Sequence, residues 1–259
     1  MALVNETGRI LQNRQVGPNL YVMEVTAPQI AAGILPGQFV HMKLPGMEGH
    51  ILRRPFSVYA VGGEGSTLEI LYQTVGFGTD HLATLGEGAV VETIGPVGHG
   101  WSLPEGCKKA LLVAGGVGAA PLFMLAQSIC ESGIELDVVL GAQTEAALVC
   151  RERYEALGAK SVSCSTDDGS FGRAGFCTSL VEEALESSSY DYVACCGPEP
   201  LMKIVAGMAG KTEAVCEVSL ERRMACGVGA CLSCVVDTVD GKKRSCVDGP
   251  VFNREQVMW

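Results

Sequence analysis

The first hundred residues alternate hydrophobic and polar side chains in short runs. The runs NLYVMEV, QFVHMKL, TLEILYQ and AVVETIG, at residues 19–25, 38–44, 67–73 and 89–95, have the period of two that is typical of strands. Turns rich in Gly and Pro separate these runs, with no regular amphipathic helices between them. Residues 1–101 are therefore predicted to form an antiparallel β-barrel.

After a short linker at residues 102–106, apolar runs of strand length alternate with helical patterns. Strands are predicted at residues 109–116, 136–142, 160–166, 190–197 and 212–220, and helices at residues 120–133, 148–158, 177–187 and 199–210. Ser179 and Glu182 have the spacing of a capping box at the start of the third helix. Because strands and helices alternate, this part is predicted to be a doubly wound parallel sheet with helices on both faces.

The C-terminal part is short and rich in glycine and cysteine. Residues 235–245 (VVDTVDGKKRS) predict a β-hairpin that turns at Asp240-Gly241. The predicted fold class is thus β plus α/β in three domains: a barrel at residues 1–101, a doubly wound domain at residues 102–213 and a small module at residues 214–259.

Four cysteines near the C-terminus carry the most specific chemical signal. Cys226, Cys231 and Cys234 have the spacing Cys-x4-Cys-x2-Cys, and Cys246 follows. This is the plant-type arrangement of thiolates around a [2Fe–2S] cluster, and the small residues between them let the backbone direct N–H groups at the sulfurs. Zinc, which usually takes two separated Cys-x2-Cys pairs, and unligated buried thiols are the alternatives.

Two loops at predicted strand ends indicate a nucleotide site. A glycine-rich turn joins the first strand of the α/β part to its helix, where backbone N–H groups and the helix N-terminus favour a diphosphate. A tight turn without a ligand is the alternative for that loop alone. A second loop follows a later strand, and the carboxyl ends of such strands face one crevice. The candidate residues are Gly115, Gly116, Gly118, Pro121, Cys196, Gly197 and Pro198.

The barrel part carries a matching pair of signals. Arg54-Pro55-Phe56-Ser57 begins one strand-like segment, and Gly76-Phe77-Gly78-Thr79 opens a short helical stretch. An arginine can hold a diphosphate with its planar fork, and a glycine-rich helix start offers backbone donors to the same kind of group. Either feature alone is typical of a surface ion pair or a turn, so their joint occurrence is the evidence.

Composition narrows the class of protein. The chain of 259 residues is 47% hydrophobic and carries a net charge of −10, which disfavours nucleic acid and anionic membranes as partners. The amino terminus lacks the pattern of a secretory signal, and glycines and a proline break the longest apolar run, at residues 110–126. A cytoplasmic protein whose twelve cysteines are thiols or ligands is expected.

The histidines form no catalytic or metal-binding spacing. His41, His50, His81 and His99 are scattered through the barrel part, and no general acid and base pair stands out in the sequence. This absence is consistent with hydride and electron transfer, in which the cofactor supplies the reactivity and the protein supplies position.

The order of the motifs RPFS, LYQ, GFGT, AGGVGAAP, CGPEPLM and ERRMACGVGACLSC resembles ferredoxin-reductase-type flavoproteins with an added iron–sulfur module. Among them it is most similar to the electron-transfer subunits of type B, NAD-dependent dihydroorotate dehydrogenases, over essentially the whole chain. The resemblance implies FAD in the barrel, NAD in the α/β domain and the cluster beyond both. It places Ser57 and Cys196 at the reacting rings, as the catalytic candidates. The implied FAD site comprises Arg54, Pro55, Phe56, Ser57, Leu71, Tyr72, Gln73, Gly78 and Thr79.

The choice between NAD and NADP depends on the loop after the second α/β strand. The sequence there is Gln143-Thr144-Glu145, and Glu145 would repel the extra phosphate of NADP. Arg151 and Arg153 follow on the next predicted helix, where a solvated face is the expected location. NAD is therefore predicted as the co-substrate.

The expected role follows from the number of electrons each group exchanges. Nicotinamide exchanges two electrons as a hydride and an iron–sulfur centre exchanges one, so a flavin is expected between them. The resemblance further implies a partner FMN subunit that oxidises dihydroorotate to orotate for pyrimidine biosynthesis, in a complex with two copies of each subunit. The alternatives are an NAD(P)H reductase subunit of a hydrogenase, a sulfur-reducing or a ferredoxin-reducing complex, and a non-redox zinc-binding module.

Overall fold

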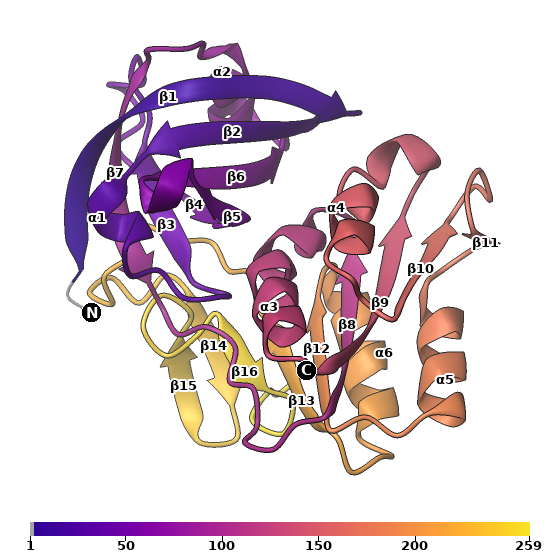
Figure 1. Cartoon of the computed structure of the whole chain (residues 1–259). Helices are drawn as coiled ribbons and strands as arrows, with labels where there is room; N and C mark the ends of the chain where they lie inside the picture. The colour runs from indigo at the N-terminus through magenta and orange to yellow at the C-terminus, as the bar shows by residue number, and fades with distance from the viewer. Residues whose placement is uncertain (1–2) are drawn as a thin grey trace.

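A computed structural model describes residues 3–259, so Met1 and Ala2, at the start of the predicted barrel, lie outside the described residues. The N-terminal part is a seven-stranded sheet in the order β4-β3-β7-β1-β2-β6-β5, and every neighbouring pair is antiparallel. The strands are β1 (Val4–Gly17), β2 (Leu20–Thr26), β3 (Phe39–Lys43), β4 (Arg54–Ser57), β5 (Ala60–Gly62), β6 (Thr67–Gln73) and β7 (Val90–Val97). The helices are α1 (Pro28–Ala31) and α2 (Phe77–Thr84). The predicted antiparallel barrel is confirmed (Figure 1).

Alternation along the strands creates the barrel core. Val40 and Met42 on β3 point into it together with Met23 of β2 and Ile70 of β6, and all four are almost completely buried. Their neighbours along each strand face the other way, as a period of two requires. The opposite face of β3 is therefore free to contact another part of the chain.

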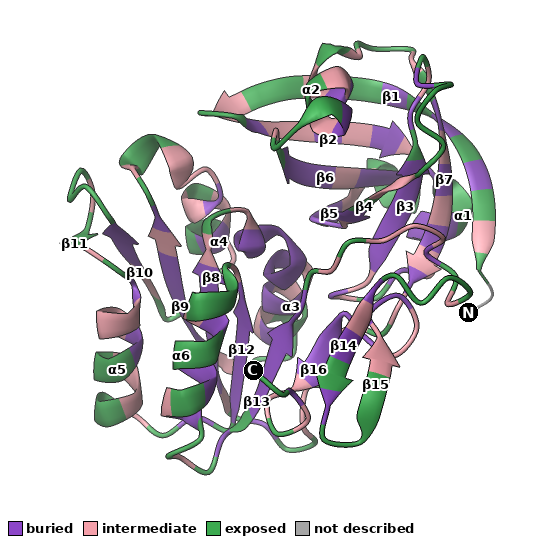
Figure 2. Ribbon diagram, turned by 180° about the vertical axis from the view of Figure 1, so that it is seen from behind, coloured by how far each residue is buried: buried purple, intermediate pink, exposed green. Residues whose placement is uncertain are grey.

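The second part is a seven-stranded sheet in the order β11-β10-β9-β8-β12-β13-β16, parallel except that β16 runs antiparallel to β13. Helices α3 and α4 share one hydrophobic core with it, and α5 and α6 share another on the opposite face. Figure 2 shows the central strands buried and the outer faces of α5 and α6 exposed. The strands are β8 (Lys109–Gly115), β9 (Glu135–Ala142), β10 (Ser161–Thr166), β11 (Arg173–Ala174), β12 (Tyr192–Cys196), β13 (Val215–Ser219) and β16 (Val251–Asn253), and the helices α3 (Ala119–Glu131), α4 (Arg151–Ala156), α5 (Thr178–Ser187) and α6 (Glu199–Ala209).

Two local predictions in this part need correction. The capping box is wrong, because Cys177 is the N-cap of α5 and Ser179 lies inside the helix, where its hydroxyl donates to the Phe176 carbonyl at 3.2 Å. The helix expected at residues 148–158 is shorter than predicted, since α4 begins at Arg151 after a separate 3-10 turn, η3 (Glu145–Ala147). Short-range spacing did not determine which residue begins the helix.

The C-terminal part leaves the α/β sheet and then returns to it. Strand β13 pairs with β12, the chain then forms the hairpin of β14 (Val235–Thr238) and β15 (Gly241–Arg244), and β16 pairs back onto β13. The hairpin turn consists of Val239 and Asp240, and Gly241, with φ of +98°, begins the return strand. The segment after residue 213 therefore completes the α/β sheet as well as carrying the cysteine loop.

Arg153 connects the barrel to the α/β domain. Its guanidinium forms an ion pair of 2.6 Å with Glu69 of β6 and lies 4.5 Å from the ring centroid of Tyr59 and 4.6 Å from that of Phe123. Arg151 lies against the Phe171 ring at 4.4 Å. The predicted solvated helix face is met in part, because both side chains contact aromatic rings and still keep 28% exposure for Arg151 and 40% for Arg153.

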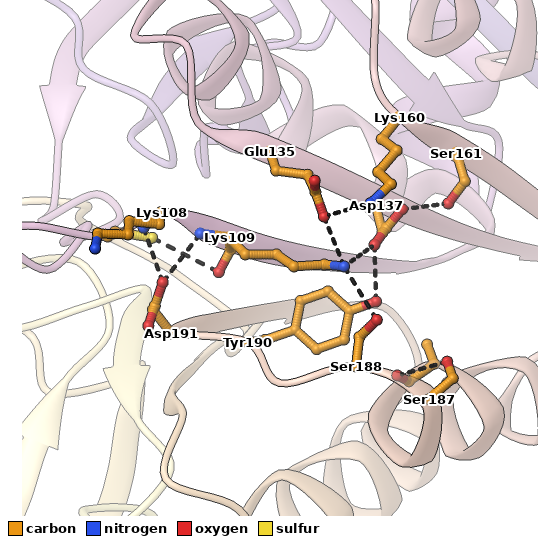
Figure 3. A network of polar contacts seen from close by, with 12 residues as sticks. Lys108, Lys109, Glu135, Asp137, Lys160, Ser161, Ser187, Ser188, Tyr190 and Asp191 are labelled. Atoms are coloured by element: carbon orange, nitrogen blue, oxygen red, sulfur yellow. Dashed lines mark hydrogen bonds and ion pairs between the residues drawn. The ribbon is translucent and has the colours of Figure 1, made fainter.

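A polar network lies at the amino-terminal edge of the parallel sheet, where β8 to β10 begin (Figure 3). Lys109 Nζ is 2.7 Å from Glu135 Oε1 and 3.3 Å from Asp137 Oδ2, and it donates to Ser188 Oγ at 3.1 Å. The Tyr190 hydroxyl donates to the same oxygen, Asp137 Oδ2, at 2.9 Å. The network satisfies its own charges and lies at the opposite edge from the candidate nucleotide loops.

We expect Lys109→Met to lower the free energy of unfolding by about 1–3 kcal/mol, because it leaves the buried Asp137 carboxylate without its cation. Urea denaturation measures the change. Lys242→Met is the matched control, since Lys242 pairs with Asp237 while both side chains are largely exposed, and we expect a loss below about 0.5 kcal/mol. Equal losses in the two variants would contradict a stabilising role for the network.

Candidate functional site

A cleft of about 850 Å³ lies between the barrel and the segment that follows β13. Three separated stretches of the chain form its walls: the end of the loop before β4 and β4 itself, the start of α2, and residues 221–224. The lining residues are Gly49, His50, Ile51, Leu52, Arg53, Arg54, Pro55, Phe56, Val75, Gly76, Gly78, Thr79, Glu221, Arg222, Arg223 and Met224. The two barrel motifs found in the sequence therefore share one cleft.

Arg54 lies across the start of α2. A Cβ added to the buried Gly78 would lie 2.4 Å from Arg54 Nε, so glycine is needed for the guanidinium to approach the helix this closely. Thr79 Oγ1 accepts from the Val75 N–H at 2.8 Å and donates to the Gly76 carbonyl at 3.0 Å, which orders the turn. A guanidinium beside the N-terminus of a helix is a favourable location for a diphosphate.

The remaining barrel candidates occupy different environments. Phe56 is buried in the barrel core and Ser57 is half-buried at the end of β4. Tyr72 is buried, its hydroxyl donates to Asn13 Oδ1 at 2.9 Å, and its ring packs edge-on against Phe56. Leu71 packs against the α/β domain, and Gln73 is exposed at the end of β6. The structure does not bring residues 71–73 into the lining of the cleft.

The two candidate nucleotide loops contact each other through their backbones. A Cβ on Gly118 would lie 2.4 Å from the Cys196 carbonyl oxygen, and one on Gly115 would lie 2.8 Å from Pro198 Cδ. Gly116 differs, because its φ is +55° and the space beside it is open. Close contact between the loops thus accounts for two of the glycines, and the turn conformation accounts for the third.

Pro121 and Glu145 lie close to these loops along the chain. Pro121 is buried in the first turn of α3, and its carbonyl accepts from the indole N–H of Trp101 at 2.9 Å. Glu145 is exposed just after β9, and its backbone N–H donates to Ser170 Oγ at 2.8 Å. Its carboxylate is therefore free to face solvent at the carboxyl edge of the sheet.

Cys196 is buried at the end of β12, and its thiol donates to the Ser219 carbonyl at 3.9 Å. Burial raises the pKa of this thiol, and the charge of Glu221 adds to the shift, so Cys196 is a neutral thiol. Neighbouring Cys195 is completely buried in the core, as predicted for packing. Glu221 also lines the cleft, so one residue lies close to both the Cys196 loop and the cleft.

Glu221 is the main site residue that sequence reasoning left without a role. It is open to the cleft, yet the surrounding protein atoms raise its pKa by desolvation. Arg222 beside it pairs with Glu199, at the start of α6, at 3.2 Å. Both residues come shortly before Cys226, and this position was the signal available in the sequence. The same segment lines the cleft and leads into the cysteine loop.

The cysteine loop arranges backbone donors around sulfur. Cys226 Sγ accepts from the N–H groups of Val228 and Cys231, each at 3.4 Å. Burial opposes ionisation of Cys226, but the donors from Val228, Cys231 and Ala230 outweigh it and lower the pKa of the thiol to about 6. A thiolate ligand needs this kind of environment.

The four cysteines form two neighbouring pairs. The Cys231 backbone N–H donates to Cys226 Sγ at 3.4 Å, and Cys234 Sγ lies 3.3 Å from Cys246 Sγ. Residues 3–259 contain no group of three or more His, Cys, Asp or Glu side chains arranged around a single metal position. Two pairs of cysteine thiols, one of them with backbone donors around Cys226 Sγ, match the ligand set of a two-iron cluster, so the residues present fit that group.

One non-glycine residue of the cysteine loop has an unusual backbone conformation. Leu232, between two of the cysteines, has φ of +59°, and its side chain is 62% exposed. A non-glycine residue in this region is strained and is held by its surroundings. This left-handed residue separates the exposed Cys231 from the buried Cys234.

The fold and the sites together define an iron–sulfur flavoprotein oxidoreductase of the ferredoxin-reductase type. Three family models match successive parts of the chain: the oxidoreductase FAD-binding domain at residues 8–101, the oxidoreductase NAD-binding domain at residues 112–207, and the iron–sulfur cluster binding domain of dihydroorotate dehydrogenase B at residues 221–258. The predicted FAD, NAD and [2Fe–2S] assignments to these domains are confirmed at the level of the family.

Comparison with whole proteins gives the particular family. The chain is 38% identical to the electron transfer subunit of dihydroorotate dehydrogenase B (NAD(+)) from Desulforamulus reducens, over 97% of each chain. It is 40% identical to the subunit of the same description from Caldanaerobacter subterraneus subsp. tengcongensis, again over 97% of each. The chain belongs to the family of electron-transfer subunits of dihydroorotate dehydrogenase B.

A solved structure of a different oxidoreductase has the same architecture. The structure of the NADH-dependent reduced ferredoxin-NADP oxidoreductase, described for flavin-based electron bifurcation, matches with a TM-score of 0.89 at 28% identity, over 97% of this chain and 90% of that one.

Within residues 3–259, the helices are all too short or too polar to cross a membrane.

Proposed function

We propose that this chain carries electrons between NAD and a partner FMN subunit that oxidises dihydroorotate to orotate, in pyrimidine biosynthesis. Its family supports this role, and one structural observation carries it. Residues 221–224 line the cleft between the barrel and the C-terminal part, and Cys226 follows two residues later. A flavin in the cleft would therefore lie next to the cluster loop along a single segment of chain.

Each domain has its own proposed cofactor residues, with the domains taken as residues 1–101, 102–213 and 214–259. Ser57 and Cys196 are proposed to face the reacting rings. The proposed FAD ligands are Arg54, Pro55, Phe56, Ser57, Leu71, Tyr72, Gln73, Gly78 and Thr79; the NAD ligands are Gly115, Gly116, Gly118, Pro121, Cys196, Gly197 and Pro198; and the cluster ligands are Cys226, Cys231, Cys234 and Cys246.

The protein's contribution is position and electrostatics. When bound, FAD supplies the ability to exchange either one or two electrons, which connects a nicotinamide to an iron–sulfur centre. Arg54 would hold the negative diphosphate against the start of α2, Glu221 lines the cleft, and the neutral Cys196 thiol is buried at the end of β12 behind the nucleotide loops. The exposed Glu145 would disfavour the 2′-phosphate of NADP.

A second function is supported by the solved structure of the ferredoxin-NADP oxidoreductase. Because that protein shares this architecture at a TM-score of 0.89, a subunit of a ferredoxin-reducing complex is the alternative. The two functions differ in the partner protein. We place the protein in the cytoplasm, in agreement with its twelve free cysteines, and we take the complex to have two copies of each subunit, as in the family it resembles.

The deciding experiment is anaerobic co-purification followed by an electron-transfer assay. The tagged chain is isolated from its own cells, its FAD, iron and sulfide are measured, and the captured protein is identified. With the FMN subunit bound, dihydroorotate should reduce NAD⁺, and NADP⁺ should react poorly. Capture of a ferredoxin-linked subunit with no dihydroorotate activity would favour the alternative, and a colourless zinc protein would exclude both.

A further inference from the structure

Strand β3 forms a wall between the barrel and the cysteine loop. Val40 and Met42 face the barrel core, so Phe39 and His41 face the other way. Phe39 packs in one buried cluster with Cys234 and Cys246. The outward face of β3 therefore contacts the C-terminal cysteine module. Phe39 and His41 are the two successive outward positions of this strand.

His41 occupies the second of these positions. Its side chain is completely buried, and neither ring nitrogen has a hydrogen-bond partner among the described residues. A Cβ on Gly227 would lie only 2.4 Å from His41 Nδ1, so the imidazole lies directly against the backbone next to Cys226. Buried polar groups without partners are rare, and they concentrate where function requires them.

The same histidine is one strand away from the flavin motif. His41 is opposite Pro55 in the pairing of β3 with β4, and Pro55 lines the cleft. A single side chain thus lies between the strand that carries Arg54 and the loop that carries the cluster cysteines. His41 lies outside the cofactor motifs of the sequence, because its contact with the cysteine loop joins residues 41 and 227.

We propose that His41 is a positioning residue for the cluster: its imidazole N–H, which is unpartnered here and lies against Gly227, would donate to the Cys226–Gly227 backbone in the cluster-loaded protein and so fix the cluster relative to the flavin cleft. This rests on the proposed cluster site. An imidazole carries an N–H donor in either protonation state, so the role does not depend on a change of charge. Second-shell donors of this kind orient metal ligands and tune the reduction potential of iron–sulfur centres.

The test compares His41→Leu with His41→Asn, which have nearly the same shape but differ in the donor. Holoprotein is prepared anaerobically, and three properties are measured: iron per FAD during incubation with a chelator, the electron paramagnetic resonance spectrum of the reduced cluster, and the cluster's reduction potential. For His41→Leu we expect roughly tenfold faster iron loss and a changed spectrum and potential, at unchanged FAD content. His41→Asn should restore most of all three, because its amide nitrogen takes the place of Nδ1.

Several results would overturn the inference. The first is that His41→Leu equals wild type in all three measurements. The second is that His41→Leu and His41→Asn are equally impaired, since equal damage means that the N–H donor has no role. Parallel loss of FAD and iron in His41→Leu would show a general folding role instead. Absence of a cluster from the wild-type protein would contradict the proposed function itself, which distinguishes the two failures.

Discussion

Replacing Cys231 by alanine should abolish electron delivery to the partner while leaving FAD reduction by NADH within about twofold of wild type. Cys231 is the exposed member of one of the two cysteine pairs, so its loss opens the cluster site without disturbing the buried pair of Cys234 and Cys246. Removal of one thiolate should cost at least the roughly 100-fold that is typical of lost metal-site contacts. Stopped-flow measurement of flavin bleaching by NADH, and a steady-state assay with the partner, report the two steps separately.

The matched control for this experiment is Cys130→Ala. Cys130 is a partly buried thiol on α3 with no place in the cluster loop, and its removal should leave iron content and both rates unchanged. Equal loss of both activities in Cys231→Ala protein that still holds FAD would contradict the proposed order of electron transfer. Retention of full iron content would show that Cys231 is not a ligand.

Replacing Arg54 by alanine should weaken FAD binding by roughly 10–100-fold. The guanidinium lies against Gly78 at the start of α2, and hydrogen bonds from a charged group to an anion contribute about 1.5–3 kcal/mol. Because the cysteine loop is supported by β3 and not by Arg54, iron content should stay near the wild-type value. Fluorescence titration of the FAD-free protein with FAD measures the affinity directly.

Arg14→Ala provides the control for the loss of one positive charge. Arg14 is exposed on β1 of the same barrel and does not line the cleft. Its removal should change FAD affinity by less than about twofold, since exposed charges at a distance are screened. An Arg54→Ala protein that binds FAD as tightly as wild type would disprove the assignment of the cleft as the diphosphate site.

Several features were accessible from the sequence because they depend on neighbouring residues. The period of two in the barrel strands and the alternation of strand and helix predicted both sheets, since hydrophobic periodicity reflects which face of each element is buried. The spacing of Cys226, Cys231 and Cys234 predicted the cluster loop because ligands within nine residues depend on local backbone geometry. The capping box at Ser179 shows the limit of local spacing, because Cys177 begins that helix instead.

Other features exist only in the folded protein. The cleft brings Arg54 together with Glu221, Arg153 packs against the rings of Tyr59 and Phe123, and His41 lies against Gly227. Each contact joins residues far apart in the chain, and no periodic pattern of neighbouring residues encodes such a pairing. The sequence by itself determined the types of element, and it predicted the cofactor motifs and the cluster ligands. Tertiary packing alone decided which of these elements meet, because it selects among long-range contacts by shape, burial and charge.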